Sequence, residues 1–593
     1  MTVASDLPVA KPAPVLPAWY PAWAKELAEL YFSGTINTFV LYGNVHDLVA
    51  VPDANGGSTF VNLADFIATQ IFGSWDVVLG YDLGRGLRAL AGSDPKRLQT
   101  MMQYAGGIFG TPNTWPREPE KVLDMLESLI QRNLLEDNLA NRKRIGLVFE
   151  HGEFLLPPGD LASLARSQGT RLVRFLSWAA NPYIKRLNMA FCLITEKASE
   201  ISERLVNNPH VAAIEIPLPS VEERKKFVEQ VTKSADANAA SKLPMSIDGL
   251  VQNAAGLSLT NLNVLLSNIN VRGLDLAQFR KLKKQLIERQ CQGLVEFIEP
   301  PHTLDLIVGQ PEAKERLQQD AQWIAEGKLD TAPMGYLFCG AVGTGKTFLA
   351  ECYAGSIGIP CLKLRNFRSK YVGESEGNLE QVLTVLRSLG PVVVIVDEAD
   401  ASLGDRNDSG DSGTSGRIFS MIAQQMGDTR YRGRIIWMLL TCRPDLLPID
   451  LKRQGRCEVH IPLFAPTTSA DIAAMFKAMS KKNKIALAAD AIPDVSPDRQ
   501  LSGADLESVL LTSRRKALSA GRTTVERADL EGAIAEFIPS SEGLEKEMQE
   551  IAAVLECTER YFLPEKWRGK VATPEARSQL QERMVVLREL IES

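Results

Sequence analysis

The chain has no long apolar run and no evident targeting segment. No stretch of its 593 residues approaches the roughly 20 consecutive apolar residues that a membrane-spanning helix requires. Segment 1–22 lacks the basic start and the continuous apolar run of a signal peptide, and its prolines predict an extended lead-in. These absences predict a cytoplasmic protein that does not insert into a membrane.

Paired cysteines and clustered histidines are absent as well. The eight cysteines show no CxxC pair and no metal-ligand spacing, and several fall within apolar runs. Buried free thiols in a reducing compartment explain this pattern. The five histidines are equally scattered, and neither His46-Asp47 nor His151-Gly152-Glu153 has a third ligand nearby in the sequence. We therefore expect no metal site built from these residues.

An excess of positive charge is also missing. The formal net charge is −6, and acidic and basic residues are interleaved rather than grouped. Binding to a phosphate backbone requires a basic surface, so nucleic acid is disfavoured as a main partner. The hydrophobic and charged fractions, 45% and 23%, are ordinary for a globular protein. The length predicts two to four domains.

A phosphate-binding loop is the clearest positive feature. Residues 340–347 match GxxxxGK[ST] between a short apolar run and a helical pattern, which argues against a chance glycine-rich turn. The loop's backbone N–H groups would surround phosphate oxygens at the start of the helix. Lys346 would reach the β- and γ-phosphates, and the Thr347 hydroxyl would bind Mg²⁺. The loop consists of Gly340, Ala341, Val342, Gly343, Thr344, Gly345, Lys346 and Thr347.

A pair of acidic residues follows an apolar run about fifty residues later. The β-branched segment 391–396 is typical of a strand buried on both faces of a parallel sheet. Ligands bind at the carboxyl ends of such strands, where Asp397 and Glu398 stand. Asp397 would hold the Mg²⁺ shell, and Glu398 would polarise the attacking water.

These motifs, with those that follow them, resemble the AAA clade of AAA+ ATPases. Segment 304–317, with Val308 and Gly309, is similar to the part of the family that packs on adenine, and segment 502–506, with Gly503 and Ala504, is similar to the start of its helical lid. The resemblance covers about residues 300–540. It implies an α/β P-loop NTPase fold with a parallel sheet and a helical lid, bound ATP and Mg²⁺, and a ring, most simply a homohexamer.

The resemblance also implies roles for residues that follow a third apolar segment, 434–440, which we expect to be a strand. Arg453 and Arg456 would be arginine fingers that act on the nucleotide of a neighbouring subunit, although local salt bridges would also explain them. The family usually has Asn at the position of Cys442, where an amide orients the attacking water. A thiol is a poorer hydrogen-bonding group, so slower turnover is expected while binding survives.

Segment 369–376 resembles the first pore loop of the family. In related rings an aromatic residue here grips an extended polypeptide through contact area rather than specific hydrogen bonds. Lys370, Tyr371 and Val372 would then contact substrate; packing of Tyr371 against the core is the alternative. The Gly-, Ser- and Asp-rich segment 404–416 resembles a second pore loop.

The first half repeats this pattern without a phosphate loop. Segment 37–43 resembles the strand that ends at Gly340, and segment 144–151 resembles the acid-bearing strand. With Glu150 set against Asp397, His151 falls at the position of Glu398. We expect a degenerate AAA-like module without catalysis; an unrelated α/β domain is the alternative.

The expected domains follow from these matches and from two proline-containing linkers. They are an extended lead-in (1–22), a degenerate AAA-like module without a P-loop (23–230), a helical lid-like region (231–298), an AAA+ ATPase core (299–465), its helical lid (466–540) and a C-terminal helical extension (541–593).

The predicted function is that of an ATP-hydrolysing ring motor that remodels, unfolds or disassembles protein substrates, directly or through an adaptor. No HExxH motif accompanies it, so built-in proteolysis is not expected. Two alternatives remain: an ATP-gated assembly protein with little turnover, which Cys442 favours, and a nucleic-acid motor, which the charge disfavours.

Overall fold

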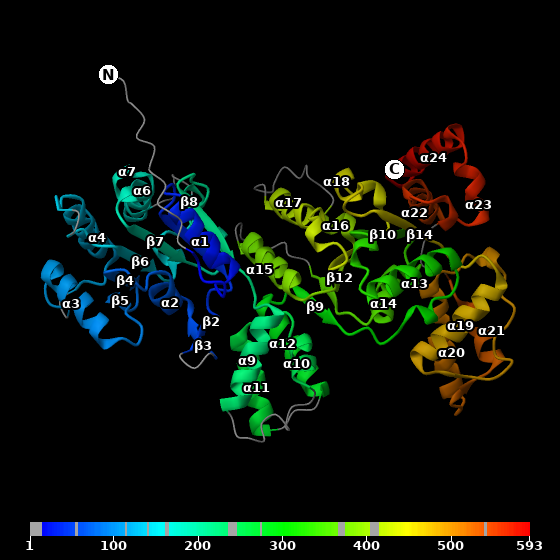
Figure 1. Cartoon of the computed structure of the whole chain (residues 1–593). Coiled ribbons are helices and arrows are strands. Elements are labelled where there is room, and N and C mark those ends of the chain that lie inside the picture. Colours follow the sequence, from blue (N-terminus) through cyan, green and yellow to red (C-terminus); the bar gives the residue numbers. More distant parts are fainter. Residues whose placement is uncertain are drawn as a thin grey trace. The chain divides into compact units, whose positions relative to one another are not determined.

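The computed structural model describes residues 15–53, 57–112, 115–138, 141–159, 165–234, 246–272, 276–365, 374–403, 414–538 and 543–592, and the structure below is that of these residues (Figure 1). The chain forms two compact units. The first is Met1–Ile287 with Glu376–Ser388, and the second is Glu288–Ser375 with Leu389–Ser593. In the described segments no helix is both long and apolar enough to cross a membrane.

The first unit contains a six-stranded sheet in the order β5-β4-β6-β7-β1-β8. All neighbouring strands are parallel except β4 and β5. The strands are β1 (Thr38–Gly43), β4 (Val77–Asp82), β5 (Gly86–Ala89), β6 (Ile145–Phe149), β7 (Met189–Ile194) and β8 (Val211–Ile216), and a separate hairpin pairs β2 (Leu48–Pro52) with β3 (Ser58–Asn62).

Both faces of this sheet are covered, which explains why its central strands are apolar throughout. Phe39 and Leu41 of β1 belong to one buried cluster, and Val40 belongs to another. The covering helices are α1 (Ala22–Phe32), α2 (Leu63–Phe66), α3 (Pro95–Phe109), α4 (Pro119–Leu134), α5 (Gly152–Leu155), α6 (Arg166–Ala180), α7 (Pro182–Arg186) and α8 (Glu203–Val206).

Helices without a sheet follow in the first unit. They are α9 (Val221–Ser234), α10 (Ile247–Asn253), α11 (Leu259–Arg272) and α12 (Leu276–Gln290). Most of α15 (Glu374–Ser388) also groups with this unit, where Arg387 pairs with Glu215 of β8 at 3.0 Å. Because α9 begins at Val221, the helical region begins about ten residues before the expected boundary at 231.

The second unit contains a six-stranded sheet in the order β14-β10-β13-β12-β11-β9. Its strands are β9 (Val295–Ile298), β10 (Gly335–Gly340), β11 (Cys361–Leu364), β12 (Val392–Val396), β13 (Ile435–Thr441) and β14 (Val459–Leu463). Only β9 is antiparallel to its neighbour, β11. Because β9 completes this sheet, the core begins before residue 299, where the sequence analysis placed its start.

The helices of the second unit fall into three groups. The first surrounds the sheet: α13 (Pro311–Ala325), α14 (Lys346–Ile357), α16 (Ala399–Leu403), α17 (Thr414–Met426) and α18 (Ile449–Lys452). The lid helices are α19 (Ser469–Asn483), α20 (Gly503–Ser519) and α21 (Arg527–Glu536), which share a separate apolar core. The C-terminal extension consists of α22 (Gly543–Glu556), α23 (Glu565–Arg568) and α24 (Pro574–Glu592).

The five parallel strands of each sheet have the same order. In each, the first central strand (β1 or β10) lies between the last strand and the strand that precedes it along the chain. In each, the second parallel strand carries an antiparallel strand at the sheet edge. The predicted fold, a P-loop α/β sheet with a helical lid in tandem with a second α/β module, is confirmed.

Candidate functional site

The loop between β10 and α14 depends on its glycines. Gly340, at φ 149°, leaves the strand where a Cβ would stand 2.2 Å from the Leu463 carbonyl oxygen. Gly345 begins α14 with φ 88°, a left-handed conformation that suits glycine. The loop can therefore turn tightly at the start of a helix, where backbone N–H groups are unpaired.

Lys346 lies over this loop. Its Nζ donates to the carbonyl oxygens of Gly340 and Ala341 at 2.9 and 3.0 Å, and to Cys442 Sγ at 3.2 Å. The amine therefore lies between the loop and Cys442, the residue that follows β13.

The acidic pair stands at the carboxyl end of the neighbouring strand, β12. Asp397 Oδ2 accepts from the Thr347 hydroxyl at 3.2 Å and from Lys363 Nζ at 2.6 Å. Glu398 has φ 48°, an uncommon conformation for a residue other than glycine. Such strain is concentrated at functional sites. The turn presents Glu398 at the edge of the sheet beside the loop.

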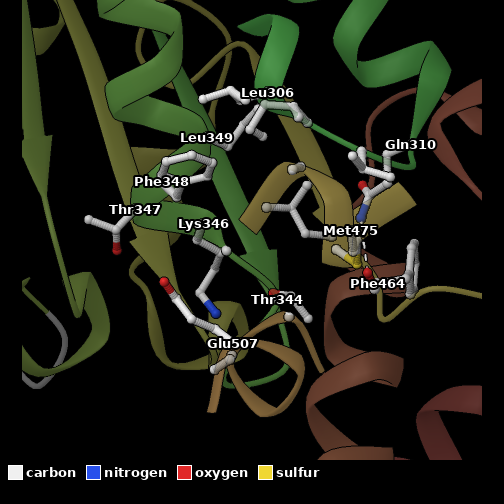
Figure 2. A pocket seen from close by; sticks show the side chains of 18 of the residues that line it. Leu306, Gln310, Thr344, Lys346, Thr347, Phe348, Leu349, Phe464, Met475 and Glu507 are labelled. Carbon is white, nitrogen blue, oxygen red and sulfur yellow. Dashed lines mark hydrogen bonds between the residues drawn. The ribbon is translucent and has the colours of Figure 1, made fainter. Parts of the chain in front are cut away.

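A cavity of about 490 Å³ joins these groups. Figure 2 shows Lys346, Thr344 and Glu507 below the apolar side chains of Leu306 and Leu349. The wall of the cavity includes the expected residues Val308, Val342, Gly343, Thr344, Gly345, Lys346, Thr347, Asp397, Glu398, Cys442, Gly503 and Ala504. Gly340 and Ala341, the first two residues of the loop, and Gly309 do not line the cavity.

The cavity has an apolar end and a charged side. Leu306, Ile307 and Val308 form part of the apolar lining. On the lid, Lys482 Nζ lies 4.7 Å from the centre of the Phe348 ring and donates to Glu507 at 3.0 Å. Burial raises the pKa of Glu507, but hydrogen bonds from Asn483 and Lys482 outweigh it and lower that pKa. An apolar end beside a charged loop suits a flat heterocycle that carries phosphates.

The lid meets the loop directly. The Ala504 N–H donates to the Gly343 carbonyl at 3.1 Å, and Ser502 caps α20 in a reciprocal pair with Asp505. A Cβ on Gly343, whose φ is 80°, would stand 2.6 Å from the Ser502 hydroxyl. Glycine is therefore required here both for the turn and for the approach of the lid.

The remaining expected residues lie elsewhere. Arg453 is exposed at the end of α18, and Arg456 donates to the Asp450 carbonyl at 2.6 Å; neither lines the cavity. Their expected target belongs to another subunit, so this chain alone leaves that role a prediction. Lys370, Tyr371 and Val372 lie outside the described residues, as does most of segment 404–416.

Two contacts of this site were not predicted from the sequence. Lys363 pairs with Asp397, and its only signal is a polar residue inside the short apolar strand β11. Gln549 of α22 accepts from the Val342 N–H at 3.1 Å. No local spacing connects Gln549 to a loop 207 residues earlier.

The first unit has counterparts at the same sheet positions. His151 follows β6 at φ 54°, as Glu398 follows β12 at φ 48°. After β1 the chain forms no lysine-bearing loop. Instead, both oxygens of Asp47 accept backbone N–H groups at the start of α11, from Leu259 and Thr260, each at 2.8 Å. Asp47 thus binds the start of α11 in the first unit. In the second unit it is the phosphate-binding loop that contacts the start of a helix, α20, through Gly343 and Ala504.

Comparison with protein families agrees with this architecture. The model described as "ATPase family associated with various cellular activities (AAA)" matches residues 336–465, which hold the loop, the acidic pair and Arg453. The models described as "AAA+ chaperone, N-terminal Rossmann-like domain" and "AAA+ chaperone, second helical domain" match residues 11–217 and 222–292. The chain belongs to the AAA+ family. The resemblance to the AAA clade is thereby confirmed, and the AAA+ chain has the domain organisation of an AAA+ chaperone.

Individual relatives of the AAA+ chain match only part of it. It is 24% identical over 348 residues to the uncharacterized AAA domain-containing protein ycf46 of Pyropia yezoensis, a match that covers 56% of this chain and 68% of that protein. It is 28% identical over 211 residues (34% of this chain) to the cell division cycle protein 48 homolog of Archaeoglobus fulgidus, and 32% identical over 206 residues (32%) to the peroxisomal ATPase PEX6 of Penicillium chrysogenum. The AAA+ chain spans only 29% and 14% of these last two proteins.

Proposed function

We propose that the chain hydrolyses ATP to ADP and phosphate at the cavity between β10, α14 and the lid. One observation carries the proposal: the strained turn at Glu398 presents a carboxylate beside Asp397, on the same cavity wall as Lys346. A general base must stand within reach of the water that it activates, and this turn directs Glu398 toward the phosphate side. The loop's N–H groups and the Lys346 amine would hold the β- and γ-phosphates, with adenine among Leu306, Ile307 and Val308.

The residues present fit a magnesium ion. Mg²⁺ prefers oxygen ligands, and the Thr347 hydroxyl and the Asp397 carboxylate lie 3.2 Å apart at the mouth of the loop. When bound, the ion would neutralise charge on the phosphates. Asp397 and Thr347 orient each other through their hydrogen bond, and Lys363 Nζ keeps a positive charge beside Asp397.

The wider proposal is a ring in which hydrolysis remodels protein substrates. AAA proteins typically oligomerise, and an exposed Arg453 at the end of α18 is suited to reach a neighbouring subunit's nucleotide together with Arg456. Tyr371, with Lys370 and Val372, would grip the polypeptide. The chaperone-type domain arrangement supports a protein substrate over nucleic acid.

A second candidate is an ATP-gated assembly protein with little turnover. The contact of Lys346 Nζ with Cys442 Sγ favours it, because a thiol replaces the family's amide beside the phosphate-binding amine. ATP turnover by the wild type, measured beside Glu398→Gln, separates the two candidates, with mass in solution recorded with and without ATP. Turnover lost in the variant, with an ATP-dependent particle near six subunits, supports the motor. ATP-dependent assembly without turnover by either protein supports the second candidate.

A further inference from the structure

Helix α22 (Gly543–Glu556), the first helix of the C-terminal extension, has polar side chains on its buried side. Lys546 and Gln549 are 8% and 5% exposed, and the Glu556 side chain is 19% exposed. Spacings of three and seven residues place all three on one face of a helix. We call these three residues the polar stripe of α22.

Buried polar groups are unfavourable unless they are paired, so the partners of the stripe show what it does. Gln549 Oε1 accepts from the Val342 N–H at 3.1 Å, and this is a backbone group of the phosphate-binding loop. Lys546 Nζ donates to the Gln500 carbonyl, two residues before the cap of lid helix α20. The stripe therefore contacts the phosphate-binding loop and the segment that leads into lid helix α20.

Its last member reaches a third element. Glu556 Oε2 accepts from Lys452 Nζ at 2.9 Å, and Lys452 directly precedes Arg453. Lys452 Nζ also donates to the Pro444 carbonyl at 2.9 Å, just after Cys442. Burial raises the pKa of Glu556, but hydrogen bonds from His460 and Lys452 outweigh it and lower that pKa, so the carboxylate stays charged.

The rest of the extension reinforces this contact. Arg588 of α24 pairs with Asp445 at 2.8 Å, and Asp445 also holds Arg443 at 2.9 Å, beside Cys442. The apolar side chains of α22, among them Met548 and Ile551, pack in a cluster with Leu580 and Leu587 of α24. The apolar side thus fixes α22 within the extension, and its polar side contacts the ATP site.

We propose that the polar stripe of α22 positions two parts of the ATPase site at once: Gln549 holds the phosphate-binding loop, and Glu556 holds, through Lys452, the segment that carries Arg453. Lys546, Gln549 and Glu556 are positioning residues, since none of them lines the cavity. The inference rests on the proposed ATP hydrolysis. It adds that the C-terminal extension, which lies beyond the matched AAA segment 336–465, belongs to the hydrolytic machinery.

The two contacts predict different kinetic effects. Gln549→Met keeps the length of the side chain but removes the acceptor of the Val342 N–H. The loop then becomes ordered only when nucleotide binds, which weakens affinity for a fluorescent ATP analogue about tenfold with little change in kcat. Lys452→Met leaves affinity unchanged and lowers kcat at least tenfold, because a misplaced catalytic arginine costs about that much or more.

The control is Glu547→Ala, two residues from Gln549 on the exposed side of α22. Glu547 pairs only at the surface, with Arg583 at 2.9 Å, so neither constant should change. Thermal unfolding of each variant checks folding. If Gln549→Met does not fold, Gln549→Asn, which shortens the side chain by one methylene, takes its place.

The outcomes are distinct. A rise in Kd for Gln549→Met and a fall in kcat for Lys452→Met, with Glu547→Ala unchanged, support the proposal. If the wild type binds and hydrolyses ATP while Gln549→Met and Lys452→Met match Glu547→Ala, the proposal is wrong and the proposed function stands. A wild type that binds ATP without hydrolysing it contradicts the proposed function, and the Kd of Gln549→Met still tests the loop contact.

Discussion

Replacing Asp47 should destabilise the start of helix α11, whose first backbone N–H groups it accepts. Asp47 is 4% exposed, and its carboxylate accepts from the N–H groups of Leu259 and Thr260, from the Thr260 hydroxyl at 3.0 Å and from Asn44 Nδ2 at 2.9 Å. The first N–H groups of a helix have no partner within it, so Asp47→Ala leaves buried donors unpaired. Each such group costs about 1–3 kcal/mol before water enters.

Partial entry of water reduces the sum, and we expect Asp47→Ala to cost about 2–4 kcal/mol locally. A chain of several domains does not unfold in one step, so a global melting curve would mix this loss with others. Hydrogen exchange of the amides at the start of α11 reports it directly. The Leu259 and Thr260 amides should exchange about 30- to 1000-fold faster, as that free energy implies.

Asp94→Ala is the matched control. Asp94 also accepts two helix N–H groups, those of Lys96 and Arg97, but it is exposed and caps its own helix, α3. Water can replace its carboxylate, so the cost should stay near 0.5–2 kcal/mol, roughly the value for a simple cap. Equal costs for the two variants, with unchanged exchange at Leu259, would refute the reasoning.

Two further predictions concern chemistry and pH. Cys442→Asn should raise kcat about three- to tenfold, because an amide bonds more strongly than a thiol beside Lys346, whereas Cys442→Ala should lower it; equal rates in a steady-state assay would contradict this. Burial, with the nearby charge of Glu215, raises the pKa of Glu380 from 4.5 to about 7. A raised carboxyl pKa means that stability is lost as pH rises from the unfolded value through the folded one. Glu380→Gln should therefore make α15 more stable than in the wild type at pH 8 and similar to it at pH 5, as measured by hydrogen exchange of the α15 amides, and the same difference at both values would contradict this.

The phosphate-binding loop and the acidic pair were predictable because their spacing is local. Residues 340–347 carry the chemistry in eight consecutive positions, and Asp397 and Glu398 directly follow an apolar strand. The central strands of the first unit were predictable for a related reason: buried parallel strands are apolar throughout, so they stand out in the sequence. The same comparison of the two halves matched His151 with Glu398, and both residues have a positive φ.

Contacts between distant segments could not be predicted in this way. Asp47 meets Leu259 across 212 residues, and Gln549 meets Val342 across 207. Whether a polar residue on an amphipathic helix faces solvent or a neighbouring loop depends on packing that no local pattern records. Strand β9 shows the same limit, since a four-residue strand joins the second sheet only through its pairing with β11.

The central claim is that assembled subunits hydrolyse ATP with a residue supplied by a neighbour. Lys346→Ala removes the phosphate-binding amine but leaves Arg453 intact, whereas Arg453→Ala leaves the phosphate-binding loop intact. Each variant alone should be nearly inactive beside the wild type. Mixed in equal amounts, they should recover a measurable fraction of wild-type turnover, because subunits with an intact loop then meet neighbours with an intact arginine. Co-assembled mixtures that stay as inactive as either variant, or an Arg453→Ala protein as active as the wild type, would contradict the claim.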